Sequence, residues 1–195
     1  MTIDPRQDAF VIVDVQNDFC PGGALAVPHG DEVVPVLNRC IQAFSAVSAP
    51  IVATRDWHPP VTRHFKAHGG IWPPHCVRGT RGAEFHPRLA LPPEATVVSK
   101  GVDPDEDAYS GFQALTPEGT PLSAWLRERG VRRLFVGGLA TDYCVKATVL
   151  DAIKEGFAVV ILEDAIRAVD LAPGDGARAL DAMKAAGTTV TTAAE

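Results

Sequence analysis

The stretch RRLFVGGLATDYCVKATVLDAIKE, residues Arg132–Glu155, decides the fold. Its apolar run Leu134–Val136 ends in a pair of glycines, which predicts a buried strand followed by a tight turn. Thr141 and Asp142 then open a segment with apolar residues at helical spacing, which predicts a crossover helix. Because a strand followed by a crossover helix is the repeating unit of parallel sheets, the stretch favours an α/β fold.

The same alternation runs through the rest of the chain. Apolar or β-branched runs predict further strands at residues 9–15, 50–54, 96–99, 158–162 and 188–191. Helical spacing predicts helices at about residues 31–47, 120–129 and 174–186. We therefore expect a single domain over residues 1–195, a three-layer doubly wound α/β fold whose central, mostly parallel sheet of about six strands is flanked by helices.

The composition narrows the classes of partner. The net charge is −6 and no lysine- or arginine-rich run occurs, so we expect no nucleic-acid partner. No segment approaches the roughly 18 apolar residues of a membrane span, and the first residues lack the apolar core of a signal peptide, so we expect no membrane partner. The four cysteines show neither CxxC nor disulfide-framework spacing, which favours the reducing cytoplasm.

Cys144 is a candidate nucleophile. It lies in the first turn of the predicted helix, where free backbone N–H groups and the helix dipole favour a thiolate. The alternative is a small buried residue that packs the helix against the sheet. Doubly wound folds bind ligands beyond the carboxyl ends of their strands, where Asp14, Asp56 and Lys100 are also expected.

Asp14 and Lys100 are the expected partners of the thiol. A charge at the end of an apolar strand needs an opposite charge, and the ammonium of Lys100 would also lower the pKa of Cys144. Asp14 would then take the thiol proton and deliver it to a leaving amine. The backbone N–H of Cys144 and one from the preceding turn would hold an oxyanion. The alternative is a buried ion pair without chemistry.

A carboxylate–histidine cluster follows the second predicted strand, in the segment RDWHPPVTRHFKAHGGIWPPHC, Arg55–Cys76. Asp56 and His58 are two residues apart and point the same way in extended backbone. His75 is a third candidate, and His64 competes with His68 for the remaining position. Neutral imidazoles with one carboxylate suit a divalent ion such as Zn, Fe or Mn. The alternative is a set of exposed loop histidines.

Six segments taken together resemble the nicotinamidase/pyrazinamidase group of the isochorismatase-like cysteine hydrolases. They are VDVQNDFCPGGAL at Val13–Leu25, TRDWHP at Thr54–Pro59, WPPHCVRGTRGAEFHP at Trp72–Pro87, SKG at Ser99–Gly101, DAYSGF at Asp107–Phe112 and GLATDYCV at Gly138–Val145. The first and last are shared across the superfamily. The pairing of the second and third is more specific, because it resembles the metal site of nicotinamidases, which isochorismatases lack.

This resemblance implies roles for individual residues. The implied catalytic triad is Asp14, Lys100 and Cys144. The implied metal ligands are Asp56, His58, His64 and His75, which leaves His68 without a role. A non-proline cis peptide is implied between Leu139 and Ala140, with the N–H groups of Ala140 and Cys144 as the oxyanion hole. The implied aromatic wall of the substrate pocket is Phe19, Trp72 and Tyr109, with Tyr143 as a variable neighbour.

The function that the resemblance implies is hydrolysis of nicotinamide to nicotinate and ammonia through a thioester, assisted by one divalent metal ion. Pyrazinamide is expected to fit the same pocket, and the reaction would belong to NAD salvage. One alternative is another hydrolase of the superfamily, such as an N-carbamoyl amidase, which would have no use for the histidines. A second is a non-enzymatic metal-binding module. The sequence leaves the oligomeric state open, a homo-oligomer included.

Overall fold

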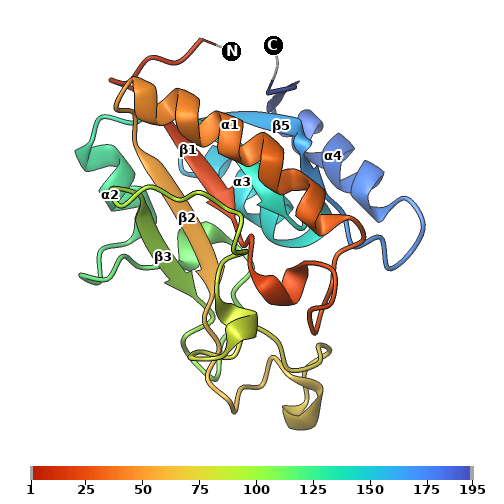
Figure 1. Ribbon diagram of the computed structural model, residues 1–195. Helices are drawn as coiled ribbons and strands as arrows, with labels where there is room; N and C mark the ends of the chain where they lie inside the picture. Colours follow the sequence, from red (N-terminus) through yellow and green to blue (C-terminus); the bar gives the residue numbers. More distant parts are fainter. Residues whose placement is uncertain (1, 194–195) are drawn as a thin grey trace.

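The structure, a computed structural model, describes residues 2–193 and contains within them one six-stranded sheet of order β3-β2-β1-β4-β5-β6 (Figure 1). The strands are β1 (Asp8–Val13), β2 (Ile51–Asp56), β3 (Thr96–Lys100), β4 (Arg133–Leu139), β5 (Ala158–Arg167) and β6 (Thr189–Thr191). Every neighbouring pair is parallel. The predicted mostly parallel sheet is therefore confirmed. The strand order reverses between β1 and β4, which is where doubly wound sheets bind ligands.

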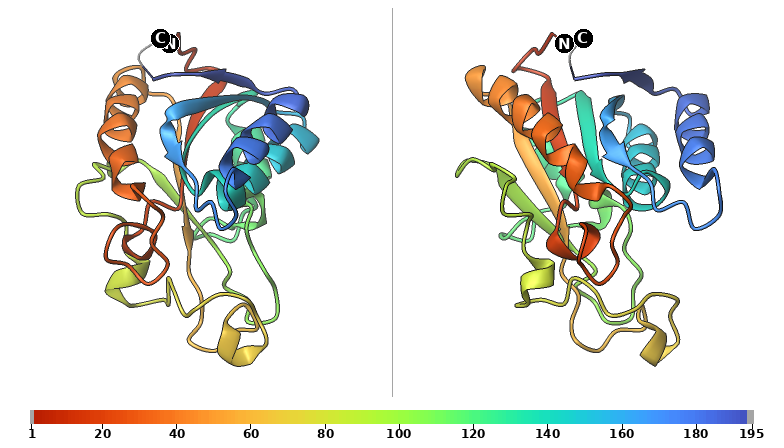
Figure 2. Two further views of the ribbon diagram at one scale, coloured as in Figure 1. Left: turned by 90° about the vertical axis from the view of Figure 1, so that its right-hand side faces the viewer. Right: turned by 45° about the vertical axis from the view of Figure 1, so that its right-hand side comes forward.

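Helices cover both faces of the sheet, and Figure 2 shows the three layers edge-on. The helices are α1 (Val33–Ala46), α2 (Leu122–Glu128), α3 (Lys146–Lys154) and α4 (Asp175–Ala185). Apolar side chains of α1 pack in one core cluster, whereas those of α2, α3 and α4 pack in a second cluster on the other face. The predicted three-layer arrangement is therefore confirmed. No helix within residues 2–193 has the length and apolar character that a membrane crossing requires.

β1 shows why its sequence is a continuous apolar run. Phe10 and Ile12 belong to the α1 cluster, whereas Ala9, Val11 and Val13 face the opposite cluster. All five side chains are fully buried. Because successive side chains of a strand point to opposite faces, a strand covered on both sides needs apolar residues at every position.

The prediction of a tight turn at Gly137 and Gly138 is wrong, since both glycines lie inside β4. A Cβ on Gly137 would stand 2.8 Å from the side chain of Leu37 in α1. A Cβ on Gly138, whose φ is 125°, would stand 2.1 Å from the carbonyl oxygen of Val13. The glycines therefore allow β4 to approach β1 and α1 closely.

The segment after β4 also differs in detail from the prediction. The chain first forms a π-helical turn, Thr141–Val145, and only then the regular helix α3. β5 runs to Arg167, five residues beyond the predicted end at residue 162. Both changes lie at the carboxyl edge of the sheet, where π-helical turns often accompany functional sites.

Candidate active site

Four side chains from four neighbouring strand ends meet at the carboxyl edge of the sheet. Asp14 follows β1, Asp56 and Lys100 end β2 and β3 in direct register, and Cys144 lies in the π-helical turn after β4. Lys100 Nζ is 2.8 Å from Asp14 Oδ2 and 3.4 Å from Cys144 Sγ, and it also pairs with Asp56 Oδ1. All four residues are buried. The structure thus brings together the residues that the sequence placed at one edge.

Burial and pairing set the charges of this group. Burial alone would lower the pKa of Lys100, but Asp14 and Asp56 raise it well above its ordinary value, so the side chain is an ammonium. Burial raises the pKa of Asp14, although Lys100 opposes the shift. Asp14 is therefore a stronger proton acceptor than an exposed aspartate.

The pKa of the Cys144 thiol is shifted in the direction opposite to the one predicted from the sequence. Burial raises its pKa well above the ordinary value, and the predicted lowering by Lys100 is present but smaller. The resting side chain is therefore a thiol rather than a thiolate. Its proton must leave during attack on a substrate, which requires a nearby base. An oxygen of Asp14 and the sulfur of Cys144 lie within 4.8 Å of one another.

Thr54 orients Asp14, a contact that sequence reasoning missed. Thr54 Oγ1 donates a hydrogen bond to Asp14 Oδ1 at 2.6 Å, while the other carboxylate oxygen faces Lys100. The backbone N–H of Asp14 also lies 3.2 Å from the Thr54 hydroxyl. The available signal was a hydroxyl residue at the end of the apolar run PIVAT, where a buried polar group needs a partner.

Gln16 holds Asp56 in place and was also missed. Its Nε2 donates to the carbonyl oxygens of Asp56 at 2.8 Å and Ala83 at 2.9 Å, and its Oε1 accepts from the Asp56 N–H at 2.8 Å. Gln16 is fully buried. A buried amide with satisfied hydrogen bonds is rigid, so it fixes the backbone that carries the Asp56 carboxylate.

The backbone before Cys144 contains a cis peptide bond between Leu139 and Ala140, as the family resemblance implied. The carbonyl oxygen of Ala140 accepts from the N–H groups of Tyr143 at 3.1 Å and Val145 at 3.0 Å. Ala140 and Cys144 both line the main pocket described below.

Three of the loop histidines gather beside Asp56. One ring nitrogen each of His58, His64 and His75 lies within 4.8 Å of the others, and all three residues are buried. Asp56 Oδ2 is 3.6 Å from His58 Nε2 and 3.8 Å from His75 Nε2. His68 is exposed and lies outside this group. The structure therefore brings His64, which the family resemblance implied, and not His68, into this group.

The donor atoms of this group fit a divalent cation. Each histidine has its Nδ1 bonded to an oxygen: Gly101 O at 3.1 Å for His58, Asp107 Oδ1 at 2.7 Å for His64 and Pro73 O at 2.8 Å for His75. Such contacts leave each Nε2 available to an ion. His58 Nε2 is buried and has no hydrogen-bond partner within residues 2–193.

The charges of the ligand candidates also fit a cation. Burial lowers the pKa of His75 to about 4 and lowers that of His64. Burial alone would raise the pKa of Asp56, but Lys100 and His58 hold it below its usual range. Neutral imidazoles and an ionised carboxylate are the forms that bind zinc, iron or manganese. Asp14, Asp56 and Cys144 also cluster, but there the Lys100 ammonium already supplies the positive charge.

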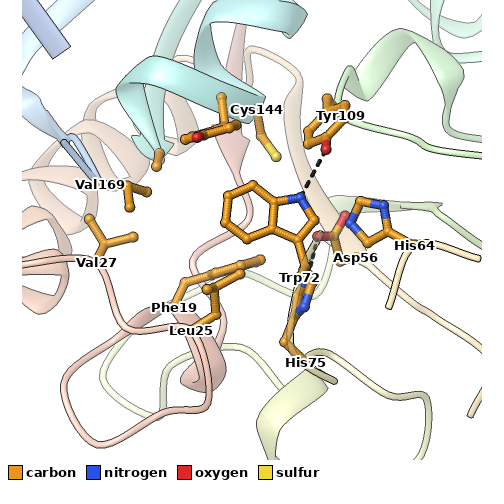
Figure 3. Close-up of a pocket in the computed structure, with 12 residues that line it drawn as sticks. Phe19, Leu25, Val27, Asp56, His64, Trp72, His75, Tyr109, Cys144 and Val169 are labelled. Atoms are coloured by element: carbon orange, nitrogen blue, oxygen red, sulfur yellow. Dashed lines mark hydrogen bonds and ion pairs between the residues drawn. The ribbon is translucent and has the colours of Figure 1, made fainter. Parts of the chain in front are cut away.

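The nucleophile and the histidine group open into one pocket, which encloses about 400 Å³ of empty space, part of it open to solvent. In the view of Figure 3 the Cys144 sulfur lies above the Trp72 indole and the His64 ring lies to its right. Trp72 Nε1 donates to the Tyr109 hydroxyl at 2.9 Å. The remaining lining residues are Phe19, Leu25, Val27, Asp56, His75, Ala140, Tyr143 and Val169. All three predicted aromatic residues are among the lining, and sequence reasoning missed the aliphatic members.

Comparison with known families then identifies the chain. The family model for the isochorismatase domain matches residues 8–195. The chain belongs to the isochorismatase family. Within this family it is 42% identical to a nicotinamidase of Escherichia coli K12, over 96% of this chain and 95% of the relative.

Two solved structures of the isochorismatase fold are similar to the chain. One is a pyrazinamidase of Pyrococcus horikoshii in complex with zinc, with a TM-score of 0.88 and 48% identity, covering 95% of this chain and 99% of that one. The other is a protein of L. infantum in complex with nicotinate, with a TM-score of 0.85 and 37% identity, covering 100% of this chain and 96% of that one.

Proposed function

We propose that this isochorismatase-family chain hydrolyses nicotinamide to nicotinate and ammonia and accepts pyrazinamide in the same pocket. One observation carries the proposal: a buried cysteine 3.4 Å from a lysine opens into the same pocket as a buried group of one aspartate and three histidines. The similarity to a nicotinamidase and to a pyrazinamidase supports this choice of substrates.

The catalytic residues are Asp14, Lys100 and Cys144. Asp14 takes the thiol proton as the sulfur of Cys144 attacks the carboxamide carbon. The N–H groups of Ala140 and Cys144 bind the oxygen that gains negative charge. Lys100 stays protonated and stabilises the charges on both sides of it, since it is 2.8 Å from Asp14 and 3.4 Å from the sulfur.

The tetrahedral adduct then breaks at its C–N bond. Asp14 returns the proton to the leaving nitrogen, so ammonia departs and a thioester on Cys144 remains. Asp14 next takes a proton from a water molecule, whose oxygen attacks the thioester carbon. The C–S bond breaks, nicotinic acid leaves and ionises to nicotinate in solution, and the proton on Asp14 returns to the sulfur of Cys144.

Asp56, His58, His64 and His75 would hold one divalent metal ion, zinc, iron or manganese. A bound ion would supply a Lewis-acid anchor that orients the substrate. Phe19, Trp72 and Tyr109 pack against the flat ring and exclude water from it, because stacked aromatic rings favour such contacts.

Ammonia release from nicotinamide by the purified protein tests the proposal, with Cys144→Ala as the control. We expect steady release by the wild type and none above background by the variant. Equal release by both proteins would remove the covalent step. No release from nicotinamide or pyrazinamide by the metal-loaded wild type would overturn the substrate assignment.

Metal removal tests the second half of the site. We expect chelator treatment to abolish hydrolysis and zinc, iron or manganese to restore it. Full activity in metal-free protein would refute the orienting role of the ion. Hydrolysis of an N-carbamoyl amide by metal-free protein would instead support the alternative predicted from the sequence, which gives the histidines no role.

We also propose that residues 1–195 form one hydrolase domain and that the enzyme acts in the cytoplasm. The four cysteines are free and buried, which supports a reducing compartment. Size-exclusion chromatography with light scattering would decide between a monomer and a homo-oligomer.

A further inference from the structure

Three consecutive residues between β3 and the 3₁₀ turn Gly111–Gln113 contact three different parts of the site. Asp107 reaches a metal-ligand candidate, Ala108 reaches the catalytic lysine and Tyr109 reaches the aromatic wall. The contacts are His64 Nδ1 to Asp107 Oδ1 at 2.7 Å, Lys100 Nζ to the Ala108 carbonyl oxygen at 3.3 Å, and Trp72 Nε1 to the Tyr109 hydroxyl at 2.9 Å. Sequence reasoning assigned no role to Asp107.

We propose that Asp107 is a positioning residue of the metal centre, which fixes the ring of His64 and joins that ring to the segment that builds the aromatic wall. This inference rests on the proposed function, because it assigns His64 to a metal that orients the substrate.

The hydrogen bond acts through the two nitrogens of the imidazole. When Asp107 accepts at Nδ1, the ring carries its proton there and Nε2 keeps its lone pair for an ion. A carboxylate also strengthens the imidazole as a ligand more than a neutral acceptor does. His58 and His75 use backbone carbonyl oxygens for this purpose. Of these three contacts, only that of His64 can therefore be removed by substituting the acceptor side chain.

The side chain of Gln113 holds the backbone of the segment that carries Asp107. Gln113 Nε2 donates to the Asp107 carbonyl oxygen at 3.2 Å, and Gln113 Oε1 accepts from the N–H groups of Tyr109 at 3.1 Å and Ser110 at 3.0 Å. The Asp107 side chain is 51% exposed, whereas that of His64 is 4% exposed. A substitution at Asp107 consequently leaves the core intact while it removes the acceptor of a buried ring.

Asp105 provides a matched control on the same segment. It is exposed, and its carboxylate makes no hydrogen bond or ion pair within residues 2–193. Asp105→Ala removes the same charge as Asp107→Ala without touching His64. Any effect of lost negative charge alone should therefore appear in both variants.

The experiment measures zinc affinity by competition with a chromophoric chelator, in metal-stripped full-length protein. We expect about 10- to 100-fold weaker binding in Asp107→Ala and wild-type binding in Asp105→Ala. Asp107→Asn should lie between them, since its amide oxygen still accepts the Nδ1 proton. With Co²⁺ in place of zinc, the visible absorption bands should shift in Asp107→Ala and not in Asp105→Ala.

Zinc binding by Asp107→Ala within about twofold of the wild type would overturn the inference. Equal weakening in Asp105→Ala would also overturn it, because the effect would then come from charge alone. If circular dichroism shows that Asp107→Ala does not fold, the isosteric Asp107→Asn takes its place. Unchanged zinc affinity and unchanged cobalt bands in Asp107→Asn would then overturn the inference.

Activity separates this inference from the proposed function. In Asp107→Ala the zinc concentration for half-maximal nicotinamide hydrolysis should rise about 10- to 100-fold, whereas in Asp105→Ala it should stay at the wild-type value. A wild type that binds zinc but releases no ammonia would defeat the proposed function, whatever the zinc affinities of the variants. A wild type that hydrolyses nicotinamide beside an Asp107→Ala protein with unchanged zinc dependence would defeat only the inference.

Discussion

Cys144 lines one pocket together with His64 and His75, but different kinds of structure hold the proposed catalytic side chains and the histidine group. Asp14 and Lys100 follow or end strands whose backbones are locked by parallel ladders. The histidines lie in the loop after β2, where no strand and no helix longer than the 3₁₀ turn Lys66–His68 occurs. Figure 1 shows this loop, in yellow, extending away from the carboxyl edge of the sheet.

The site thus has two halves, the strand-end residues and the loop histidines, and they should differ in how much a bound metal ion stabilises them. At the strand ends, the carboxylates of Asp14 and Asp56 are already paired with a positive charge, the Lys100 ammonium. The histidine half is a buried group of ring nitrogens, with the rings of His58 and His64 stacked at 4.7 Å. A buried polar group without partners is costly, so this half should gain the most from a bound cation.

The largest expected effect is the loss of the base in Asp14→Asn. Proton transfer by a positioned group contributes about 10²- to 10⁴-fold, so kcat for nicotinamide should fall by about 10³-fold. Zinc content should stay at the wild-type level, because Asp14 lies outside the histidine group. A variant that keeps its activity, or that loses its zinc, would show that the two halves are not separable in this way.

The converse change is His75→Ala, which removes a ligand and leaves the strand ends untouched. Loss of orientation costs about 10²-fold for a displaced substrate, so kcat/KM for nicotinamide should fall by about that factor. The purified variant should hold less than stoichiometric zinc. Its thermal unfolding should match that of metal-free wild type, because the sheet does not depend on the ion. Wild-type kcat/KM in a zinc-depleted variant would contradict the orienting role.

The strand ends were predictable because each is visible as a local pattern. Asp14 interrupts the run AFVIVDV and Lys100 closes TVVSK, so a charge at the end of a buried strand marks each position. Parallel pairing then brings such positions to one edge, whatever the loops do. The meeting of these residues at one edge follows from the fold class, whereas the orientation of Asp14 also depends on Thr54.

Composition and spacing predicted the loop half only as a group of histidines. They left the choice between His64 and His68 open, and only the family resemblance implied His64, which is buried whereas His68 is exposed. The contacts of Gln16 with Asp56 and of Asp107 with His64 span 40 and 43 residues along the chain. The glycines of β4 were misread for the same reason, since their neighbours Leu37 and Val13 come from distant segments.

A pH experiment probes the packing of α1 against the sheet through one buried thiol. Burial raises the pKa of Cys40, in α1, to about 11. The folded protein then keeps this thiol neutral while the unfolded chain, with a pKa near 9, begins to ionise. The stabilisation is complete below about pH 9 and is lost as the pH rises toward 11.

Urea denaturation at pH 8 and pH 10.5 measures this loss. Between these values the free energy of unfolding of the wild type should fall by about 1 to 2 kcal/mol more than that of Cys40→Ala, after allowance for solvent screening. Parallel loss in both proteins would place the alkaline sensitivity elsewhere. Burial also raises the pKa of Cys76 in the loop, so only the difference between the wild type and Cys40→Ala isolates the contribution of Cys40.

The smallest effect is expected where the two halves meet, in Tyr109→Phe. The hydroxyl of Tyr109 accepts from Trp72 Nε1 at 2.9 Å, and its removal leaves the ring in the pocket wall. A neutral hydrogen bond of this kind contributes about 0.5 to 1 kcal/mol, so KM for nicotinamide should rise about two- to fivefold. Because Tyr109 does not hold Lys100 or Cys144, kcat should remain at the wild-type value. A fall in kcat with unchanged KM would show that the aromatic wall acts on the catalytic residues. The strand-end residues and the loop would then not act separately.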